Sequence, residues 1–139
     1  MVSAAGDARP AGVPVTSMNE EVYPDGLTQI LTWIVEEYPP IELYVTENGA
    51  AFSLGEDPAH DRERRYFLAA HFRAAHHALE AGVPLGGFFV WSLLDNFEWA
   101  KGYQDRFGIV GVGFESQRRY LRTSARWYRD VRAHNGLER

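Results

Sequence analysis

Two carboxylates stand where apolar stretches of the chain give way to polar residues. The stretch "IELYVT" (residues 41–46) leads directly into Glu47, and "GGFFVWSLL" (86–94) leads into a segment that contains Glu98. Trp91 lies inside the second stretch. A pair of carboxylates beside flat aromatic faces suits glycoside hydrolysis, in which one carboxylate attacks the sugar and another transfers a proton. The alternative at this level is that both glutamates only cap or solubilise the ends of strands.

Each of these apolar stretches predicts a short buried strand. Residues 41–46 are rich in β-branched and aromatic side chains, and the continuous apolar run 86–94 is typical of a strand covered on both faces. A further extended piece is predicted at "IVGVGF" (109–114). Helical periodicity and end signals predict three helices, at residues 25–38, 61–81 and about 123–136.

The predicted order of elements is helix, strand, helix, strand, helix. Two strands joined through a helix form a right-handed parallel βαβ unit. Ligands of such α/β folds bind at the carboxyl ends of the strands, so Glu47 and Glu98 are expected to face the same side. Thr46 and Asn48 flank Glu47. Polar neighbours of this kind keep a carboxylate ionised, as a nucleophile must be.

The composition excludes several classes of partner. The chain has 139 residues, 45% of them hydrophobic and 14% aromatic, which is enough for one modest domain with a buried core. Its net charge of −5 argues against a nucleic-acid partner, because phosphate binding requires a basic face. No apolar run reaches about 18 residues, so no membrane span is predicted. The chain has no cysteine, which excludes disulfides and thiolate zinc sites and favours a cytoplasmic location.

Clusters of basic and imidazole side chains have ordinary interpretations. His71, His76 and His77 share one predicted helix, but spacings of five and six residues do not place two ligands on one face as a spacing of four does. They are interpreted as core or solvated side chains, and neither a metal nor another cofactor is predicted. A group of arginines is interpreted as a solvated helix face; its members are Arg118, Arg119, Arg122, Arg126, Arg129 and Arg132.

The first residues of the chain give no strong structural signal. Residues 1–17 are rich in Gly, Pro, Ala and Ser, and residues 1–15 are expected to form a loose segment. They lack the basic start and the apolar stretch of a signal peptide. The structured part is therefore expected to cover residues 16–139.

Two long motifs carry a resemblance to a known family. "LYVTENGAAF" (43–52) precedes "GGFFVWSLLDNFEWAKGYQDRFGIVGV" (86–112), with "EVYPDGL" before them and "SARWYRDV" after them. They resemble the nucleophile strand, the last barrel strand with its following loop, and the flanking segments of glycoside hydrolase family 1, the β-glucosidase family. The resemblance covers roughly residues 14–136. It implies an α/β fold that is a partial (β/α)8 TIM barrel, made of the last two strand–helix units.

The resemblance also implies roles for five residues. Glu47 is expected to be the nucleophile, and Trp91 the platform beneath the sugar. Glu98 is expected to hold sugar hydroxyls, with Trp99 beside it. Phe107 is expected to wall the pocket, although a purely packing role fits it as well. These roles suit the side chains, because a carboxylate accepts strong hydrogen bonds from hydroxyls and an indole covers the apolar face of a pyranose.

The family's general acid/base is not expected in this chain. A complete barrel typically needs about 250 residues, and the family's acid/base glutamate lies in a Thr-x-Asn-Glu-Pro motif on an earlier strand. The stretch "TSMNEE" (16–21) contains Asn19 and Glu20, but Glu21 stands where that motif requires proline. Glu20 is therefore not expected to act as the acid.

Three functions remain open. The first is hydrolysis of β-D-glucosides by a retaining mechanism, with this chain carrying the nucleophile and the sugar-binding half. The second is non-catalytic sugar binding, and the third is a structural role as a barrel fragment. Unpaired strand edges invite association, so we expect the chain to form homo-oligomers or to pair with the missing N-terminal half of the barrel.

Overall fold

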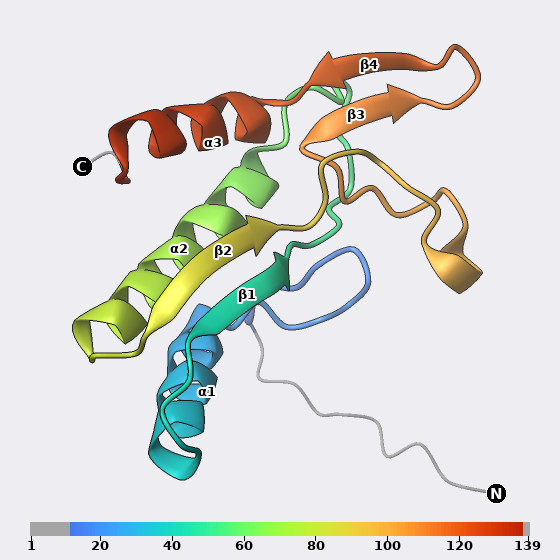
Figure 1. Ribbon diagram of the computed structural model, residues 1–139. Coiled ribbons are helices and arrows are strands. Elements are labelled where there is room, and N and C mark those ends of the chain that lie inside the picture. The colour runs from blue at the N-terminus through green and yellow to red at the C-terminus, as the bar shows by residue number, and fades with distance from the viewer. Residues whose placement is uncertain (1–11, 138–139) are drawn as a thin grey trace, which may run out of the picture.

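The computed structural model describes residues 12–137, so most of the predicted loose segment 1–15 lies outside the described residues. The elements follow the order that the sequence predicts, with a hairpin added before the last helix (Figure 1). They are α1 (Pro24–Glu37), β1 (Leu43–Asn48), α2 (Arg62–Glu80), β2 (Leu85–Val90), the 3-10 turn η1 (Trp99–Lys101), β3 (Val110–Gly113), β4 (Arg118–Leu121) and α3 (Thr123–His134).

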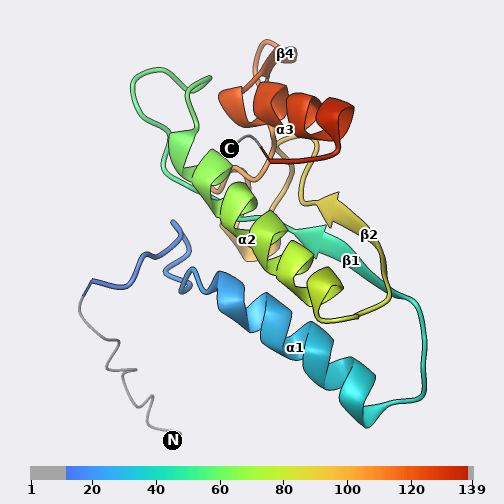
Figure 2. The same ribbon diagram turned by 90° about the vertical axis from the view of Figure 1, so that its left-hand side faces the viewer.

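β1 and β2 form a parallel two-stranded sheet joined through α2, as predicted. Both α1 and α2 pack on one face of this sheet (Figure 2). Val45 packs under these helices, and Phe88 contacts Phe72 of α2. Because neighbouring side chains along a strand alternate between faces, Tyr44 and Phe89 point to the opposite, open face, where they are 50% and 57% exposed. A register shift between residues 85 and 87 places Leu85 on the covered face as well. The covered face is filled by Leu27, Leu31, Val35, Leu43, Val45, Ala78, Val83 and Leu85.

The strand ends differ from the predicted ones. β1 extends past Glu47, which lies inside the strand, whereas β2 ends at Val90 although the apolar run continues. Residues 92–95 leave the sheet and lie along the chain that enters β3. The Ile109 N–H donates a 2.9 Å hydrogen bond to the carbonyl oxygen of Ser92. The apolar run at 86–94 therefore belongs to two differently paired segments.

β3 and β4 form an antiparallel hairpin, of which the sequence predicts only the first strand. The missed strand β4, "RRYL", has three exposed residues out of four and shows no alternation of apolar side chains. Its turn places Gln117 at a φ of 56°, without the glycine or asparagine that usually announces a hairpin.

Two arginines lie fully enclosed beneath this hairpin. Arg64 is 1% exposed and Arg122 is 0% exposed, so the interpretation of Arg122 as part of a solvated helix face is wrong. Arg122 forms a bidentate pair with Asp95, with both distances at 2.8 Å, while Arg64 pairs with Asp61 at 3.2 Å. Buried charges persist only when they are paired and hydrogen-bonded. The other five arginines of that group are exposed, as predicted, but Arg118 and Arg119 lie on β4 and not on a helix.

Asp61 precedes α2, but its carboxylate accepts hydrogen bonds from the first residues of α3. Its Oδ1 accepts hydrogen bonds from the Ser124 N–H at 2.9 Å and from the Thr123 hydroxyl at 2.8 Å. The Ser124 hydroxyl donates to Oδ2. The first N–H groups of a helix have no partner within the helix, and a side-chain oxygen satisfies one of them. One carboxylate therefore connects the starts of α2 and α3.

Candidate active site

The end of β1 brings Glu47 close to Trp91. Asn48, the last residue of β1, pairs in register with Val90, and its carbonyl oxygen accepts a 2.9 Å hydrogen bond from the Trp91 N–H. The Glu47 side chain is exposed. Within residues 12–137 it forms no hydrogen bond or ion pair. Its carboxylate therefore stands at the carboxyl end of the sheet, open to an incoming ligand.

Gly49 accounts for the sharp turn that follows. A Cβ at position 49 would lie 1.6 Å from the carbonyl oxygen of Trp91, a distance that no pair of non-bonded heavy atoms tolerates. Glycine is the residue that permits such a close approach of two backbones. The contact fixes the separation of the two strand ends, and with it the position of Glu47 relative to Trp91.

Phe107 lies behind the turn that follows Trp91. Trp91 is half-buried, and its peptide bond to Ser92 is cis. The Ser92 N–H donates a 3.3 Å hydrogen bond to the carbonyl oxygen of Phe107. The Phe107 residue itself is only 7% exposed. Its position is that of a packed core side chain, with little of its surface open to a ligand.

Glu98 and Trp99 lie on the loop that continues from β2, where Trp99 begins the 3-10 turn η1. The Glu98 N–H donates a 2.7 Å hydrogen bond to the carbonyl oxygen of Gly102, which closes a tight turn. Glu98 is half-buried, whereas Trp99 is 84% exposed. In the described part of the chain, no hydrogen bond or ion pair joins Glu98 to Glu47. Glu98 thus follows the carboxyl end of β2 along the chain, with no direct link to Glu47 among the described residues.

Two buried amide oxygens close in sequence to Glu47 and Glu98 have no donor within residues 12–137. They are the Oδ1 atoms of Asn48, which follows Glu47, and of Asn96, which lies two residues before Glu98. Buried polar atoms in folded proteins nearly always have a hydrogen-bond partner. A water molecule, a ligand or another polypeptide can supply the donor that each amide oxygen lacks. The sequence gives no signal for this, because burial decides it.

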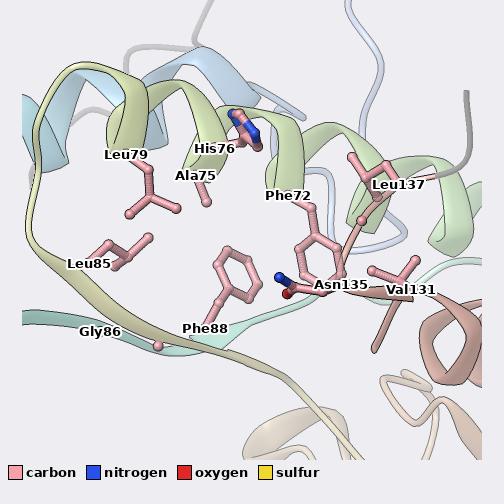
Figure 3. A pocket seen from close by; sticks show the side chains of 12 residues that line it. Phe72, Ala75, His76, Leu79, Leu85, Gly86, Phe88, Val131, Asn135 and Leu137 are labelled. Atoms are coloured by element: carbon pink, nitrogen blue, oxygen red, sulfur yellow. The ribbon is translucent and has the colours of Figure 1, made fainter. Parts of the chain in front are cut away.

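An apolar groove of about 280 Å³ lies elsewhere, between α2, β2 and the end of α3 (Figure 3). Phe72, Leu79, Phe88 and Val131 are among its lining side chains, and none of the five candidate site residues lines it. A sugar site needs several placed polar groups, and no carboxylate lines this groove. The groove is therefore a packing surface rather than the site of the chemistry.

The remaining polar residues of the sequence analysis stand apart from this site. Glu20 is exposed in a turn that is closed by a 2.9 Å hydrogen bond from the Thr16 N–H to its carbonyl oxygen. His71 is buried and the two neighbouring histidines are exposed, so both interpretations made for the three histidines occur. Burial lowers the pKa of His71, against a hydrogen bond to the Phe67 carbonyl that raises it.

Across residues 12–137, no group of three His, Cys, Asp or Glu side chains is placed to hold a metal ion. None of the helices in that range combines the length and the apolar character needed to cross a membrane.

Comparisons with known proteins identify a matching family and several relatives of this chain. The profile of glycosyl hydrolase family 1 matches residues 3–137. Beta-glucosidase A of Thermotoga maritima is 51% identical over 129 residues, which are 91% of this chain and 29% of that protein. The 6-phospho-beta-galactosidase 1 of Streptococcus pneumoniae is 39% identical over 128 residues, 87% of this chain and 27% of that protein.

The solved structures agree with the sequence comparison. The family 1 β-glucosidase structure from Thermotoga maritima superposes with a TM-score of 0.89 at 49% identity, and covers 94% of this chain and 30% of that one. This chain thus spans less than a third of the length of these relatives. The resemblance seen in the motifs is confirmed: the chain belongs to glycosyl hydrolase family 1.

Proposed function

We propose that this chain is the C-terminal part of a retaining β-glucosidase, and that it supplies the nucleophile and the sugar platform for hydrolysis of β-D-glucosides. The observation that carries the proposal is the position of Glu47. It projects unpaired from the end of β1, held beside Trp91 through the Asn48 carbonyl. It does so in a chain that is 51% identical to a β-glucosidase.

The proposed chemistry follows from the side chains at the strand ends. A Glu47 oxygen attacks the anomeric carbon, so that a carbon–oxygen bond to the enzyme forms as the bond to the aglycone breaks. The departing oxygen takes a proton from a second carboxyl group, and water later releases the sugar. The indole of Trp91 covers one face of the sugar ring. Glu98 accepts hydrogen bonds from sugar hydroxyls, and Trp99 lies beside it.

We further propose that the second carboxyl group comes from the part of a family barrel that this chain does not span. A retaining enzyme needs its two carboxyl groups about 5 Å apart. Glu20 is not assigned that role, because it lies exposed in a turn and Glu21 replaces the proline of the family motif. In this arrangement β1 and β2 are the last two strands of a (β/α)8 barrel.

The same barrel would cover the surfaces that this chain leaves open. Within residues 12–137, β1 and β2 have no other strand on their outer edges, and the open face carries Tyr44 and Phe89. We propose that preceding strands of the barrel, or a second copy of this chain, pair with these edges. We also propose a cytoplasmic location, which rests on the absence of cysteine and which cell fractionation tests.

The nucleophile can be tested without the missing acid. A dinitrophenyl 2-deoxy-2-fluoro-β-glucoside has a leaving group that needs no protonation. We expect the purified chain to gain one fluoroglucosyl unit in intact mass, and peptide mapping to locate it on Glu47. Glu47→Gln should gain nothing. Glu42→Gln, which changes an exposed carboxylate just before β1, is the matched control and should label like the parent. Equal labelling of both variants would reject the assignment.

The proposal that the second carboxyl group lies outside this chain needs a second experiment. The chain is mixed with the portion of Thermotoga maritima β-glucosidase A that it does not match, and nitrophenyl glucoside turnover is followed. We expect turnover only from the mixture, and none when Glu47→Gln replaces the parent chain. Turnover by the chain alone would contradict the proposal that the acid lies elsewhere.

Non-catalytic sugar binding is the second candidate, and the exposure of Trp99 favours it. An indole that is 84% exposed is a ready stacking surface for a sugar. Saturation-transfer NMR with glucose separates the two candidates when combined with the labelling experiment. Sugar contact that is lost in Trp91→Ala, together with no labelling of Glu47, would support a binding role alone.

A further inference from the structure

The segment that joins Trp91 to Glu98 is anchored at one buried carboxylate, Asp95. Apolar burial contributes little to holding this segment, because Leu93 is 65% exposed and Phe97 is 58% exposed. Asp95 is only 5% exposed. The conformation of this segment therefore depends on the contacts of the Asp95 side chain.

We propose that the buried ion pair between Asp95 and Arg122 positions this segment, and through it the sugar contacts Trp91 and Glu98. The inference rests on the proposed function, which assigns those two contacts. Neither Asp95 nor Arg122 would touch the sugar. Both are positioning residues, which act by fixing where the platform and the binding carboxylate stand.

The Asp95 carboxylate is bound on both of its oxygens. Oδ1 accepts hydrogen bonds from the Gly108 N–H at 3.0 Å and from Arg122 at 2.8 Å. Oδ2 accepts from the Val112 N–H at 3.1 Å and from the other terminal nitrogen of Arg122 at 2.8 Å. A second cation, Arg106, lies 3.7 Å from Oδ2. A bidentate fork fixes the plane of the carboxylate as well as its distance, which a point charge does not.

Arg122 is held in turn by backbone carbonyl groups. Its Nε donates a 3.1 Å hydrogen bond to Pro58, and its guanidinium also donates to Gly108. Arg64 donates to the same Gly108 carbonyl at 2.7 Å. Burial lowers the pKa of Arg122, but the hydrogen bond and charge of Asp95 outweigh it and raise the pKa overall. The fork therefore stays charged and rigid.

Backbone hydrogen bonds carry this anchor toward Trp91. The Asp95 N–H donates to the Val110 carbonyl, and the Ser92 N–H donates to the Phe107 carbonyl, both at 3.3 Å. Residues 92–95 are thus laid along the chain that enters β3. A displacement of Asp95 is therefore expected to move Trp91, which precedes it, and also Glu98, which follows it in the loop.

Fluorine NMR of the full chain, labelled with 5-fluorotryptophan, tests this without any sugar. The chain has four tryptophans, whose signals are assigned by single Trp→Phe changes. Arg122→Lys keeps the positive charge but removes the fork. We expect it to shift or broaden the signals of Trp91 and Trp99 while that of Trp33 in α1 stays in place. Asp130→Asn, which breaks an exposed ion pair, is the matched control and should move none of them.

Two results of that experiment would overturn the proposal. One is unchanged Trp91 and Trp99 signals in Arg122→Lys. The other is an equal change in all four signals, which would indicate general loosening of the fold.

The second measurement is affinity for isofagomine lactam, a ligand found in a Thermotoga maritima β-glucosidase structure. Calorimetry should give about tenfold weaker binding in Arg122→Lys than in the parent chain, the effect of about 1.4 kcal/mol. Unchanged affinity would contradict the positioning role. If the parent chain binds no such ligand, the proposed function fails in this chain, while the fluorine spectra still decide whether the ion pair positions the segment.

Discussion

The N–H of Trp91 donates a 2.9 Å hydrogen bond to the carbonyl oxygen of Asn48, directly across the carboxyl ends of two parallel strands. This bond fixes the backbone of Trp91 beside Asn48, the residue that follows Glu47. Because this hydrogen bond joins main-chain atoms, the spacing between the backbones of Glu47 and Trp91 is fixed by the sheet and not by flexible side chains.

Replacement of Glu47 should leave the fold intact. Its side chain is exposed and forms no hydrogen bond or ion pair among the described residues, and surface substitutions of this kind change stability by about 0.5 kcal/mol at most. Urea denaturation of Glu47→Gln should therefore match that of the parent chain. A large loss of stability would mean that Glu47 stabilises the fold. The absence of label in Glu47→Gln would then be explained by unfolding and not by loss of the nucleophile.

Gly49→Ala should damage both the fold and the candidate site. The new methyl group would meet the Trp91 carbonyl oxygen, and forcing the strand ends apart is expected to cost about 1–3 kcal/mol, the usual cost of overpacking. Thermal unfolding measures the loss, and tryptophan fluorescence reports the displacement of Trp91. Gly55→Ala is the control, because nothing lies within 4 Å of its would-be Cβ. Similar losses in both variants would contradict the strand-end explanation.

The titration of His71 should make the protein less stable in mild acid. Burial lowers its pKa in the folded chain, so the unfolded chain binds a proton more readily, and stability falls as the pH drops from about 6.5 through that lowered pKa. His71→Phe keeps the stack on Phe67, whose ring lies 3.9 Å away, and cannot titrate. Urea denaturation at about pH 7 and about pH 5 should show a smaller difference for this variant than for the parent.

The control for that experiment is His76→Gln. His76 lies on the same helix but is exposed, so its replacement should leave the pH dependence close to that of the parent. If both variants reduce the acid sensitivity equally, burial of His71 is not its cause.

A charge on the open face of the sheet should reduce association. Phe89 is 57% exposed there, next to strand edges that can pair with another chain. Phe89→Lys should lower the mass that light scattering measures after size exclusion, because a lysine on a sheet face or edge opposes pairing. Tyr66→Lys adds the same charge on α2, at a residue that is 50% exposed, and should leave the mass unchanged. A monomeric parent chain would show that this face needs no partner.

Much of the fold follows from local sequence. The period of apolar residues locates α1, α2 and α3 to within a few residues, since each helix must bury one face. The β1–α2–β2 unit follows from the element order. The missed β4 has polar side chains and no glycine in its turn, so its pairing with β3 depends on tertiary contacts that no local pattern encodes.

The candidate site is only partly readable from sequence. Glu47 and Trp91 can be found because each lies at or near the end of an apolar stretch, and a backbone hydrogen bond joins Trp91 to Asn48, the residue after Glu47. The burial of Arg122 cannot be found in this way. It stands among exposed arginines, and only its distant partner Asp95 distinguishes it. Long-range pairing of charges leaves no periodic signal.

The hydrogen bonds of the Asp61 carboxylate link the local unfolding of α2 to that of α3. This carboxylate stands at the start of α2 and receives the first hydrogen bonds of α3 from Ser124 and Thr123. Fraying at the start of α2 would displace the carboxylate that binds the first residues of α3. The two should therefore exchange their first amide hydrogens with one shared opening free energy, as a single cooperative unit that spans 62 residues of sequence separation.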